Sequence, residues 1–374
     1  MKAAARLETI QFLRGVAVTA VVISHAMHEL SALLAGHLRD FDEKLFPGDF
    51  GVDLFFVISG FIMVYVSRDV FAQPGAAVDF MRRRIVRIVP LYWIMTTAMI
   101  AVVVLLPDNV RTATNDPGQW LASYFFIPYE RASDGLVRPV LGLGWSLQYE
   151  MLFYALFAVG LVTPRRVAIP LVTGLIFTVW FAGNHMTGTG AWVQFLKHPI
   201  VFEFTAGMFL GWAFVVGVRI PVTICVLLAI AGVGLLFAAP GFNDTVDLSR
   251  HMVYGIPALL IVAAFILFPE AGHVHVGRVS LEAGETSYAT YLTHPFVLGG
   301  MSLVANRLGL PALVGPYIFS AVYVVIACLL CLTIGYQVHY RLDQPLTRRI
   351  AATLPSRTRP GAARTIPDAK QPTS

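Results

Sequence analysis

Charge is scarce in this sequence of 374 residues, because only 13% of them are Asp, Glu, Lys or Arg while 57% are hydrophobic. A soluble protein carries roughly a quarter charged residues, so the composition excludes an ordinary soluble fold. Cysteine is also scarce, and its three copies lie inside apolar segments, which argues against a disulfide framework. The basic residues lie between apolar segments, so the net charge of +5 does not indicate nucleic-acid binding.

Long hydrophobic runs, by contrast, are plentiful. Turn residues or charges separate apolar segments at 9–30, 51–67, 88–106, 145–162, 167–183, 199–218, 221–239, 251–269, 287–305 and 313–337. Backbone polar groups in lipid must be bonded within their own segment, so each run is expected to be a helix. We therefore predict an all-α, polytopic integral membrane helix bundle of about ten transmembrane helices, with no fused soluble domain.

The positions of the basic residues predict the topology. Most of the 27 Lys and Arg lie on one side of the membrane if the N-terminus is cytoplasmic. The positive-inside rule then predicts that both termini are cytoplasmic. Residues 1–350 are expected to form the transmembrane domain. Residues 351–374 are rich in Pro, Arg, Thr and Ala without an apolar period, and a disordered cytoplasmic tail is predicted there.

Two ionisable residues stand out in the first apolar segment. Arg14 and His25 are eleven residues apart, which is about three helical turns and 16 Å, so both lie on one helix face. Such residues are costly in hydrocarbon and are expected to face the bundle interior or a wet cavity. Alternatively, Arg14 extends to the lipid headgroups and His25 caps the far end of the helix. Their shared face favours a functional pair.

Five later stretches combine polar and aromatic residues. They are 51–65 (GVDLFFVISGFIMVY), 80–93 (FMRRRIVRIVPLYW), 144–154 (GWSLQYEMLFY), 202–207 (FEFTAG) and 287–295 (SYATYLTHP). In this order, with Arg14 and His25 ahead of them, they resemble the membrane-bound acyltransferase-3 family over about residues 6–350. In particular, they look like the bacterial exopolysaccharide O-acetyltransferases of the succinoglycan type.

The resemblance implies an enzyme that transfers an acyl group, usually acetyl from cytoplasmic acetyl-CoA, to a sugar hydroxyl at the outer face of the bacterial inner membrane. Its partners would be acyl-CoA, a polysaccharide or lipid-linked sugar acceptor, membrane lipids and polysaccharide-assembly proteins. Some family members carry an extracytoplasmic SGNH hydrolase-like domain. Because no Gly-Asp-Ser block is present, such a domain is expected to be a separate chain.

An anionic donor requires cationic residues near the inner face. Arg84 and Arg87 are three residues apart and share one side of a helix, and guanidinium groups match phosphate oxygens. The R-x-x-R signature of the family maps onto this pair. Arg14, deeper in the bundle, would then hold a phosphate or the pantetheine arm. The alternative is that the basic stretch 82–87 is a topology signal in contact with anionic lipid.

His25 is the candidate general base, since imidazole is suited to accept the hydroxyl proton near neutral pH. An acyl-His intermediate remains an alternative. Asp53, Glu150 and Glu203 are all expected near the depth of His25, and Glu150 is the preferred partner. Asp53 and Glu203 are expected instead to stabilise helix N-termini. His294, which precedes a proline, is expected to have a structural role.

Two other possibilities follow from the same residues. A transporter or flippase of glycan or acyl donor would also show broken helices and buried ionisable residues, although the sequence has no related halves. Within the family, a succinyl group or a small-molecule acceptor is the alternative. His273 and His275 lie near Glu270, but no further ligand of suitable spacing follows, so no metal is expected.

Overall fold

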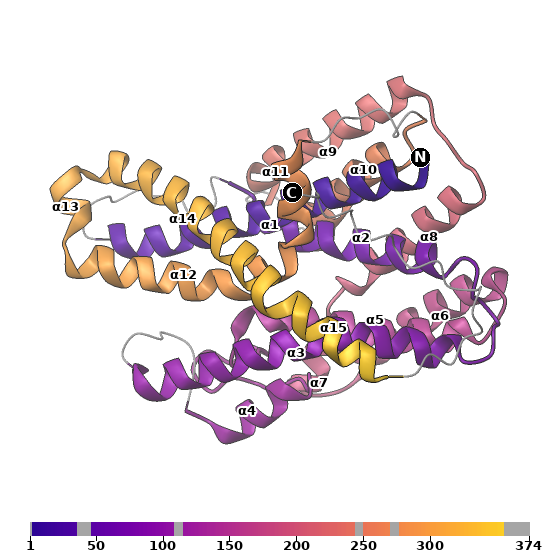
Figure 1. The fold of residues 1–374 in the computed structure, drawn as a ribbon, viewed down its shortest axis with the longest axis horizontal. Coiled ribbons are helices and arrows are strands. Elements are labelled where there is room, and N and C mark those ends of the chain that lie inside the picture. The colour runs from indigo at the N-terminus through magenta and orange to yellow at the C-terminus, as the bar shows by residue number, and fades with distance from the viewer. Residues whose placement is uncertain (1, 36–45, 108–114, 244–249, 270–276, 355–374) are drawn as a thin grey trace.

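The computed structural model describes residues 2–35, 46–107, 115–243, 250–269 and 277–354 (Figure 1). In this part of the chain, helices are the only regular elements besides an isolated antiparallel bridge between Glu130 and Val137. In chain order they are α1 (Lys2–Leu34), α2 (Phe50–Ser67), α3 (Ala76–Leu105), α4 (Pro117–Tyr124), η3 (Gly142–Gly144), α5 (Trp145–Leu161), α6 (Arg165–His185), α7 (Ala191–Lys197), α8 (Val201–Val215), α9 (Val222–Asn243), η4 (His251–Gly255), α10 (Ile256–Ile266), α11 (Arg278–Glu285), α12 (Ser287–Arg307), α13 (Leu310–Val314), α14 (Pro316–Val338), η5 (His339–Asp343) and α15 (Gln344–Thr353).

The predicted fold class is confirmed. A helix lies on each of the apolar segments expected from the sequence. Within the described residues, six helices are long and apolar enough to cross a membrane, and two shorter apolar helices cover 222–238 and 252–266. The short helices α4, α7, α11, α13 and α15 are additional, since hydropathy alone does not reveal them. The structure is thus a polytopic membrane helix bundle.

Two boundaries differ from the sequence prediction. Helix α3 begins at Ala76, directly after Gly75 with its positive φ of 81°, so it starts well before the apolar segment 88–106 and contains the basic stretch 82–87. Helix α15 continues to Thr353, three residues into the predicted tail. The remainder of that tail, and the loop with His273 and His275, lie outside the described residues.

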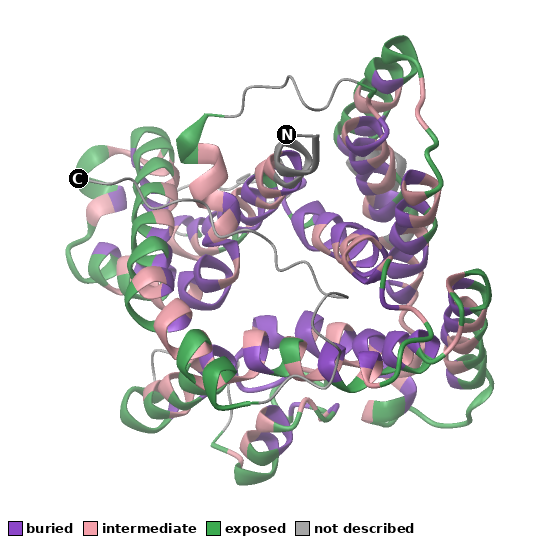
Figure 2. Cartoon of the chain, turned by 45° about the vertical axis from the view of Figure 1, so that its right-hand side comes forward, coloured by how far each residue is buried: buried purple, intermediate pink, exposed green. Residues whose placement is uncertain are grey.

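Helix α1 runs through the bundle and packs against α2, α11, α12 and α14 (Figure 1). Buried residues lie along the inner helix faces and exposed ones along the outer faces (Figure 2). The outer faces are themselves apolar, as Leu227, Ile230 and Phe237 of α9 and Leu329 of α14 show. Exposed apolar surface of this kind suits contact with lipid.

Helices α2 and α8 are in close backbone contact. A Cβ atom on Gly60 would lie 2.2 Å from the Phe204 carbonyl oxygen, and one on Gly207 would lie 2.1 Å from the Val57 carbonyl oxygen. Only glycine allows the two backbones to approach so closely. This contact fixes α2 against the bundle.

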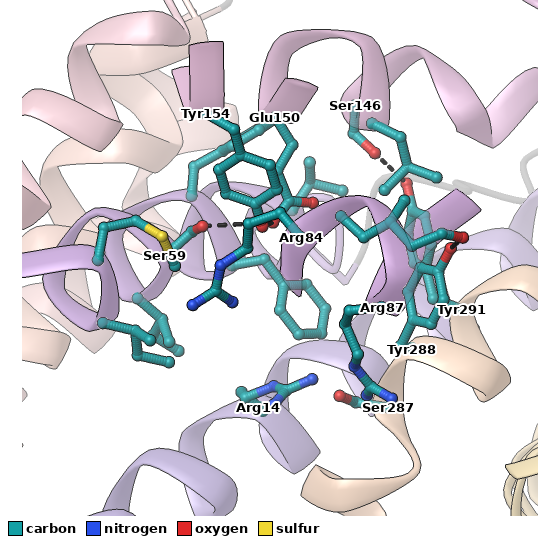
Figure 3. Close-up of a pocket in the computed structure, with 18 residues that line it drawn as sticks. Arg14, Ser59, Arg84, Arg87, Ser146, Glu150, Tyr154, Ser287, Tyr288 and Tyr291 are labelled. Atoms are coloured by element: carbon teal, nitrogen blue, oxygen red, sulfur yellow. Dashed lines mark hydrogen bonds between the residues drawn. The ribbon is translucent and has the colours of Figure 1, made fainter. Parts of the chain in front are cut away.

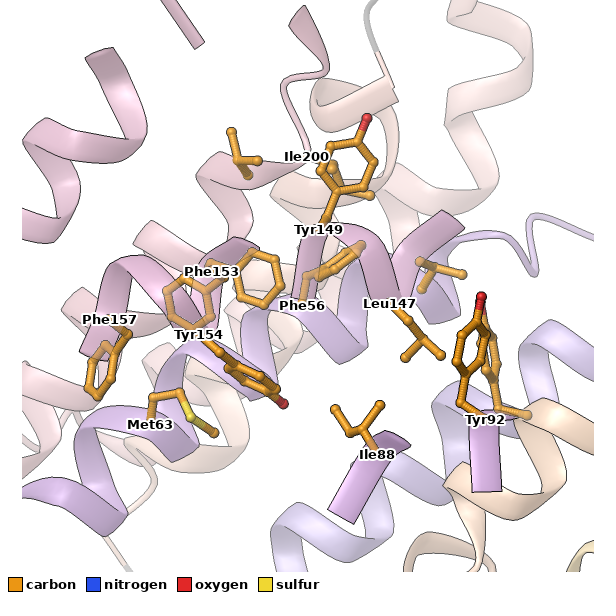
Figure 4. Close-up of a cluster of buried hydrophobic side chains, with 14 of the residues drawn as sticks. Phe56, Met63, Ile88, Tyr92, Leu147, Tyr149, Phe153, Tyr154, Phe157 and Ile200 are labelled. Atoms are coloured by element: carbon orange, nitrogen blue, oxygen red, sulfur yellow. The ribbon is translucent and has the colours of Figure 1, made fainter. Parts of the chain in front are cut away.

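The aromatic core beside this contact joins α2, α3, α5 and α8 (Figure 4). The Phe153 and Phe204 rings stack with centroids 4.1 Å apart, and Phe56 packs on Phe204 at 4.6 Å. Tyr154 belongs to the same cluster. Phe56 and Tyr154 also line the pocket described next, so the core supports one wall of that pocket.

Candidate active site

A pocket of about 870 Å³, its open mouth included, lies between α1, α2, α3, α5 and α12. Apolar side chains, mostly of α2, form much of its wall, while polar side chains from five helices converge on it (Figure 3). These polar residues are Arg14, Ser59, Arg84, Arg87, Ser146, Glu150, Tyr154, Ser287, Tyr288 and Tyr291.

All three arginines predicted to bind the donor line this pocket. Arg14 comes from α1, and Arg84 and Arg87 come from α3, with their guanidinium groups around the same open space (Figure 3). Glu150 is the acidic residue among the lining side chains. The arginines outnumber it, so the pocket favours an anionic ligand.

Two other arginines of the same basic stretch do not line the pocket. Arg82 Nη2 lies 3.9 Å from Asp79 Oδ1, and Arg83 is exposed. The alternative that the stretch serves as a topology signal therefore fits these two side chains. It does not describe Arg84 and Arg87, which turn into the bundle.

Arg87 is held by a residue that the sequence analysis did not single out. Its Nη1 donates to Asp343 Oδ2 at 3.0 Å, and its guanidinium carbon lies 5.5 Å from the Tyr288 ring centroid. Asp343 is buried, ends the π-helical turn η5, and brings the same Oδ2 within 3.0 Å of His339 Nδ1. One carboxylate thus fixes both an imidazole and a pocket arginine.

Arg84 and Arg14 have no such carboxylate in the described part of the chain. The Arg84 guanidinium carbon lies 5.4 Å from the Phe80 ring centroid and 5.7 Å from that of Tyr154, and its Nε is buried without a hydrogen-bond partner there. Arg14 Nη1 makes a long contact of 3.5 Å with Gln11 Oε1. Both guanidinium groups therefore retain donors for a phosphate.

Glu150 belongs to the arginine pocket rather than to the surroundings of His25. Its Oε1 accepts hydrogen bonds from Ser59 Oγ, at 3.3 Å, and from the Tyr154 hydroxyl. The expected pairing of Glu150 with His25 is not present in the described residues. A carboxylate at this position offsets part of the arginine charge inside the bundle.

His25 lies outside the set of side chains that line the pocket. Its Nδ1 is 2.9 Å from the Val21 carbonyl oxygen, and its ring packs on that of His294 with centroids 4.9 Å apart. A carbonyl oxygen only accepts, so Nδ1 carries the proton and Nε2 keeps a lone pair. His25 is exposed, and a neutral imidazole with a free Nε2 is suited to act as a base.

Aromatic residues connect the two regions. Tyr291 lines the pocket, and its ring centroid lies 5.8 Å from that of His294, which in turn contacts His25. The Tyr291 hydroxyl is fixed by contacts of 2.9 Å with Ser146 Oγ and 3.0 Å with the Leu143 carbonyl oxygen. Tyr291 and His294 thus lie between the arginine pocket and His25.

The other two acidic candidates are placed as the helix-terminus alternative predicts. Asp53 lies in the first turn of α2 and Glu203 in the first turn of α8, and both are buried. Arg250, which the sequence analysis did not consider, donates through Nη2 to Asp53 Oδ2 at 2.7 Å. Neither acidic residue makes a hydrogen bond to His25 in the described structure.

The sequence held a signal for some of the missed residues. Ser59, Tyr154, Tyr288 and Tyr291 all lie within the stretches that carry the family resemblance, although no role was assigned to them. Asp343 lies outside those stretches. Its only signal is an acidic residue in a basic C-terminal segment, and its burial could be seen only in the structure.

The fold and the site together describe a membrane helix bundle with an arginine-lined internal pocket. The profile of the acyltransferase-3 family, described as an acyltransferase domain, matches residues 7–336. The chain is also 34% identical over 310 residues to the "exopolysaccharide production protein ExoZ" of Rhizobium meliloti, covering 81% of this chain and 90% of that protein. No solved structure matches it. The chain belongs to the acyltransferase-3 family and is a membrane-bound O-acyltransferase.

Proposed function

We propose that this protein transfers an acetyl group from acetyl-CoA to a sugar hydroxyl of an exopolysaccharide or of its lipid-linked precursor. The observation that carries the donor assignment is the convergence of Arg14, Arg84 and Arg87 on one pocket. CoA is the anionic part of such a donor, and guanidinium groups bind its phosphates through charge-assisted hydrogen bonds. The similarity to a protein named for exopolysaccharide production supports the acceptor assignment.

The donor pocket and the base lie at different depths. Along α1, Arg14 and His25 are about 16 Å apart. The phosphates would occupy the arginine end, and the pantetheine arm would extend past Tyr291 toward His25. In this arrangement the arginine end faces the cytoplasm of a bacterial inner membrane, consistent with the basic residues that flank it.

His25 would act as the general base. Its Nε2 accepts the proton of the sugar hydroxyl while the oxygen attacks the thioester carbonyl. The carbon–sulfur bond then breaks, and the imidazolium returns the proton to the departing CoA thiolate. In the alternative, the imidazole attacks first, and an acyl-His intermediate is then cleaved by the hydroxyl.

Family membership disfavours the transporter alternative, because it places the chain among acyltransferases. The identity of the acyl group and of the acceptor is decided by experiment. Membranes that contain the wild-type protein are incubated with acetyl-CoA or succinyl-CoA, labelled in the acyl group, and with polysaccharide from a deletion strain.

We expect label from acetyl-CoA in the polysaccharide, with equimolar release of free CoA. His25→Ala should slow transfer by about a hundredfold or more, on the scale of a lost general base, while Arg166→Ala, at an exposed position outside the pocket lining, should retain it. Label incorporated from succinyl-CoA but not from acetyl-CoA would show that the transferred group is succinyl and not acetyl. The absence of transfer to any polymer by the wild-type protein would overturn the proposed acceptor.

A further inference from the structure

A second pair of arginines lies at the His25 end of the bundle. The guanidinium carbons of Arg138 and Arg250 lie 5.6 Å and 5.9 Å from the Trp145 ring centroid. Trp145 begins α5 and directly precedes Ser146, which lines the pocket and contacts Tyr291. The Trp145 indole therefore contacts two cations, and it lies next to the end of the pocket that Ser146 and Tyr291 line.

The two arginines differ in their counter-ions. Arg250 bonds Asp53 at 2.7 Å, and its Nη1 lies 3.8 Å from Asp49 Oδ2. Arg138, in contrast, makes no side-chain hydrogen bond or ion pair with the described residues, although it is half-buried. Burial, which disfavours the charged form, and the nearby cation Arg131 lower the pKa of Arg138 from its ordinary value.

The backbone of Arg138 is held in place. Its N–H donates to the Tyr129 carbonyl oxygen at 3.2 Å, and its own carbonyl accepts from Gln119 Nε2 at 3.0 Å. The preceding turn is closed by Arg131, which pairs with Asp134 through its guanidinium group. These contacts fix the main chain from which the Arg138 side chain extends over Trp145.

Arg138 is also near the expected site of chemistry. Arg138 is one of the titratable side chains that act electrostatically on His25, together with His28, Asp49 and His294. Arg138 and Arg250 act in the same way on Tyr291, which separates His25 from the arginine pocket. An anion on Arg138 would thus lie close to His25, whereas the donor phosphates already have three arginines at the other end.

We propose that Arg138, held over Trp145, binds an anionic group of the acceptor glycan next to the hydroxyl that is acylated. This proposal rests on the proposed function. The group that Arg138 binds is an oxyanion attached to the acceptor. This oxyanion is either the carboxylate of an acidic sugar or the diphosphate of a lipid-linked oligosaccharide. A guanidinium group binds either one with paired hydrogen bonds.

The test uses equilibrium binding to the purified full-length protein in detergent micelles. The probes are a uronic-acid oligosaccharide, its carboxyl-reduced neutral counterpart, and glucose linked to a short prenyl diphosphate. The wild-type protein should bind one anionic probe about tenfold more tightly than the neutral one, the scale of one charge-assisted contact. The probe that is preferred identifies the source of the anion.

Arg138→Gln should remove this preference and leave the binding of acetyl-CoA unchanged, which also shows that the variant is folded. Arg138→Lys should restore part of the preference, because it keeps the charge but loses the planar fork. Arg307→Gln is the matched control, since Arg307 is an exposed arginine at the end of α12 and should leave the preference intact.

Equal binding of all three probes by the wild-type protein, or an unchanged preference in Arg138→Gln, would overturn the proposal. A rise in the Kd of acetyl-CoA in Arg138→Gln would assign Arg138 to the donor instead. Failure of the proposed function is a separate result, because it is seen in the transfer assay and not in the binding assay. In that case the wild-type protein transfers no acetyl group to any glycan, whatever its binding preference.

Discussion

The two ends of the candidate site are built from different chemistry. The inner pocket is lined by Arg14, Arg84, Arg87 and one carboxylate, that of Glu150, and is walled by apolar side chains. The region around His25 contains imidazole and aromatic rings, and its cations lie on an indole. The first arrangement suits the retention of a multiply charged ligand, and the second suits proton transfer and recognition of a sugar. In the proposed function, this difference separates binding of the donor from chemistry along α1.

The largest expected effect separates the two ends by kinetics. His25→Ala should lower kcat for acetyl transfer by about 10²- to 10⁴-fold, because a general base contributes on that scale. The Kd for acetyl-CoA should stay within about twofold, since His25 does not line the arginine pocket. Initial rates with labelled acetyl-CoA and a direct binding measurement together give both values.

A parallel loss of acetyl-CoA binding in His25→Ala would contradict this division. His25→Gln provides the matched variant, because its amide fills similar space without a basic nitrogen. A kcat that remained at the wild-type level in both variants would remove His25 from the mechanism.

The opposite pattern is expected for the arginine pocket. Arg84→Gln or Arg87→Gln should each raise the Kd for acetyl-CoA by about tenfold or more, the scale of hydrogen bonds between charged groups. Arg83→Gln removes the same charge from the same helix, but Arg83 is exposed, so little change is expected. If all three variants weakened binding equally, the stretch would act through its general charge rather than through the pocket.

The sequence was sufficient for the fold class because the free energy of lipid insertion depends on composition over a whole segment. It was less informative about boundaries, as helix α3 shows. The arginines at 82–87 lower the hydropathy of that stretch, yet they favour a helix and continue it from Ala76. Short helices such as α4 depend on local capping, here by Asp116, and are invisible to hydropathy.

The sequence predicted the arginine end of the candidate site better than the surroundings of His25. The spacing of Arg84 and Arg87 placed them on one face, and the structure places both at the pocket with Arg14. The assignment of Glu150 to His25 relied on estimated depth and on the family-like residues around Glu150, and neither specifies which way a side chain turns. Glu150 turns toward Ser59 and Tyr154 instead. Arg250 and Asp343 join sites through contacts between segments far apart in sequence, which no local pattern contains.

A smaller effect is expected for the imidazole between the two ends. His294 is fully buried, and neither ring nitrogen has a hydrogen-bond partner in the described residues. Its contact with His25 suggests a positioning residue, so His294→Leu should lower kcat by roughly tenfold and leave the Kd for acetyl-CoA unchanged. His294→Asn, which retains polar atoms, should recover part of kcat. Equal activity of both variants and the wild type would favour the structural role expected from the sequence.

The smallest effect is expected for Asp343, which acts on the donor through Arg87. Asp343→Asn keeps the shape of the side chain but weakens the 3.0 Å contact that orients the Arg87 guanidinium. The KM for acetyl-CoA should rise about threefold to tenfold, the range of a single hydrogen bond, with kcat nearly unchanged. In a double variant with Arg87→Gln, Asp343→Asn should raise the KM little further, because the arginine that Asp343 positions is already absent.

The direction of this change decides what the carboxylate does. If Asp343 competes with the donor phosphates for Arg87, Asp343→Asn should lower the KM instead of raising it. Glu282→Gln is the control, because it breaks a comparable pair with Arg278, whose contact of 2.8 Å lies on an exposed helix face. Asp343→Asn should weaken donor binding when Arg87 is present and should cause no further loss when Arg87 is already Gln. That pair of results would establish that η5 positions the donor site from outside the pocket.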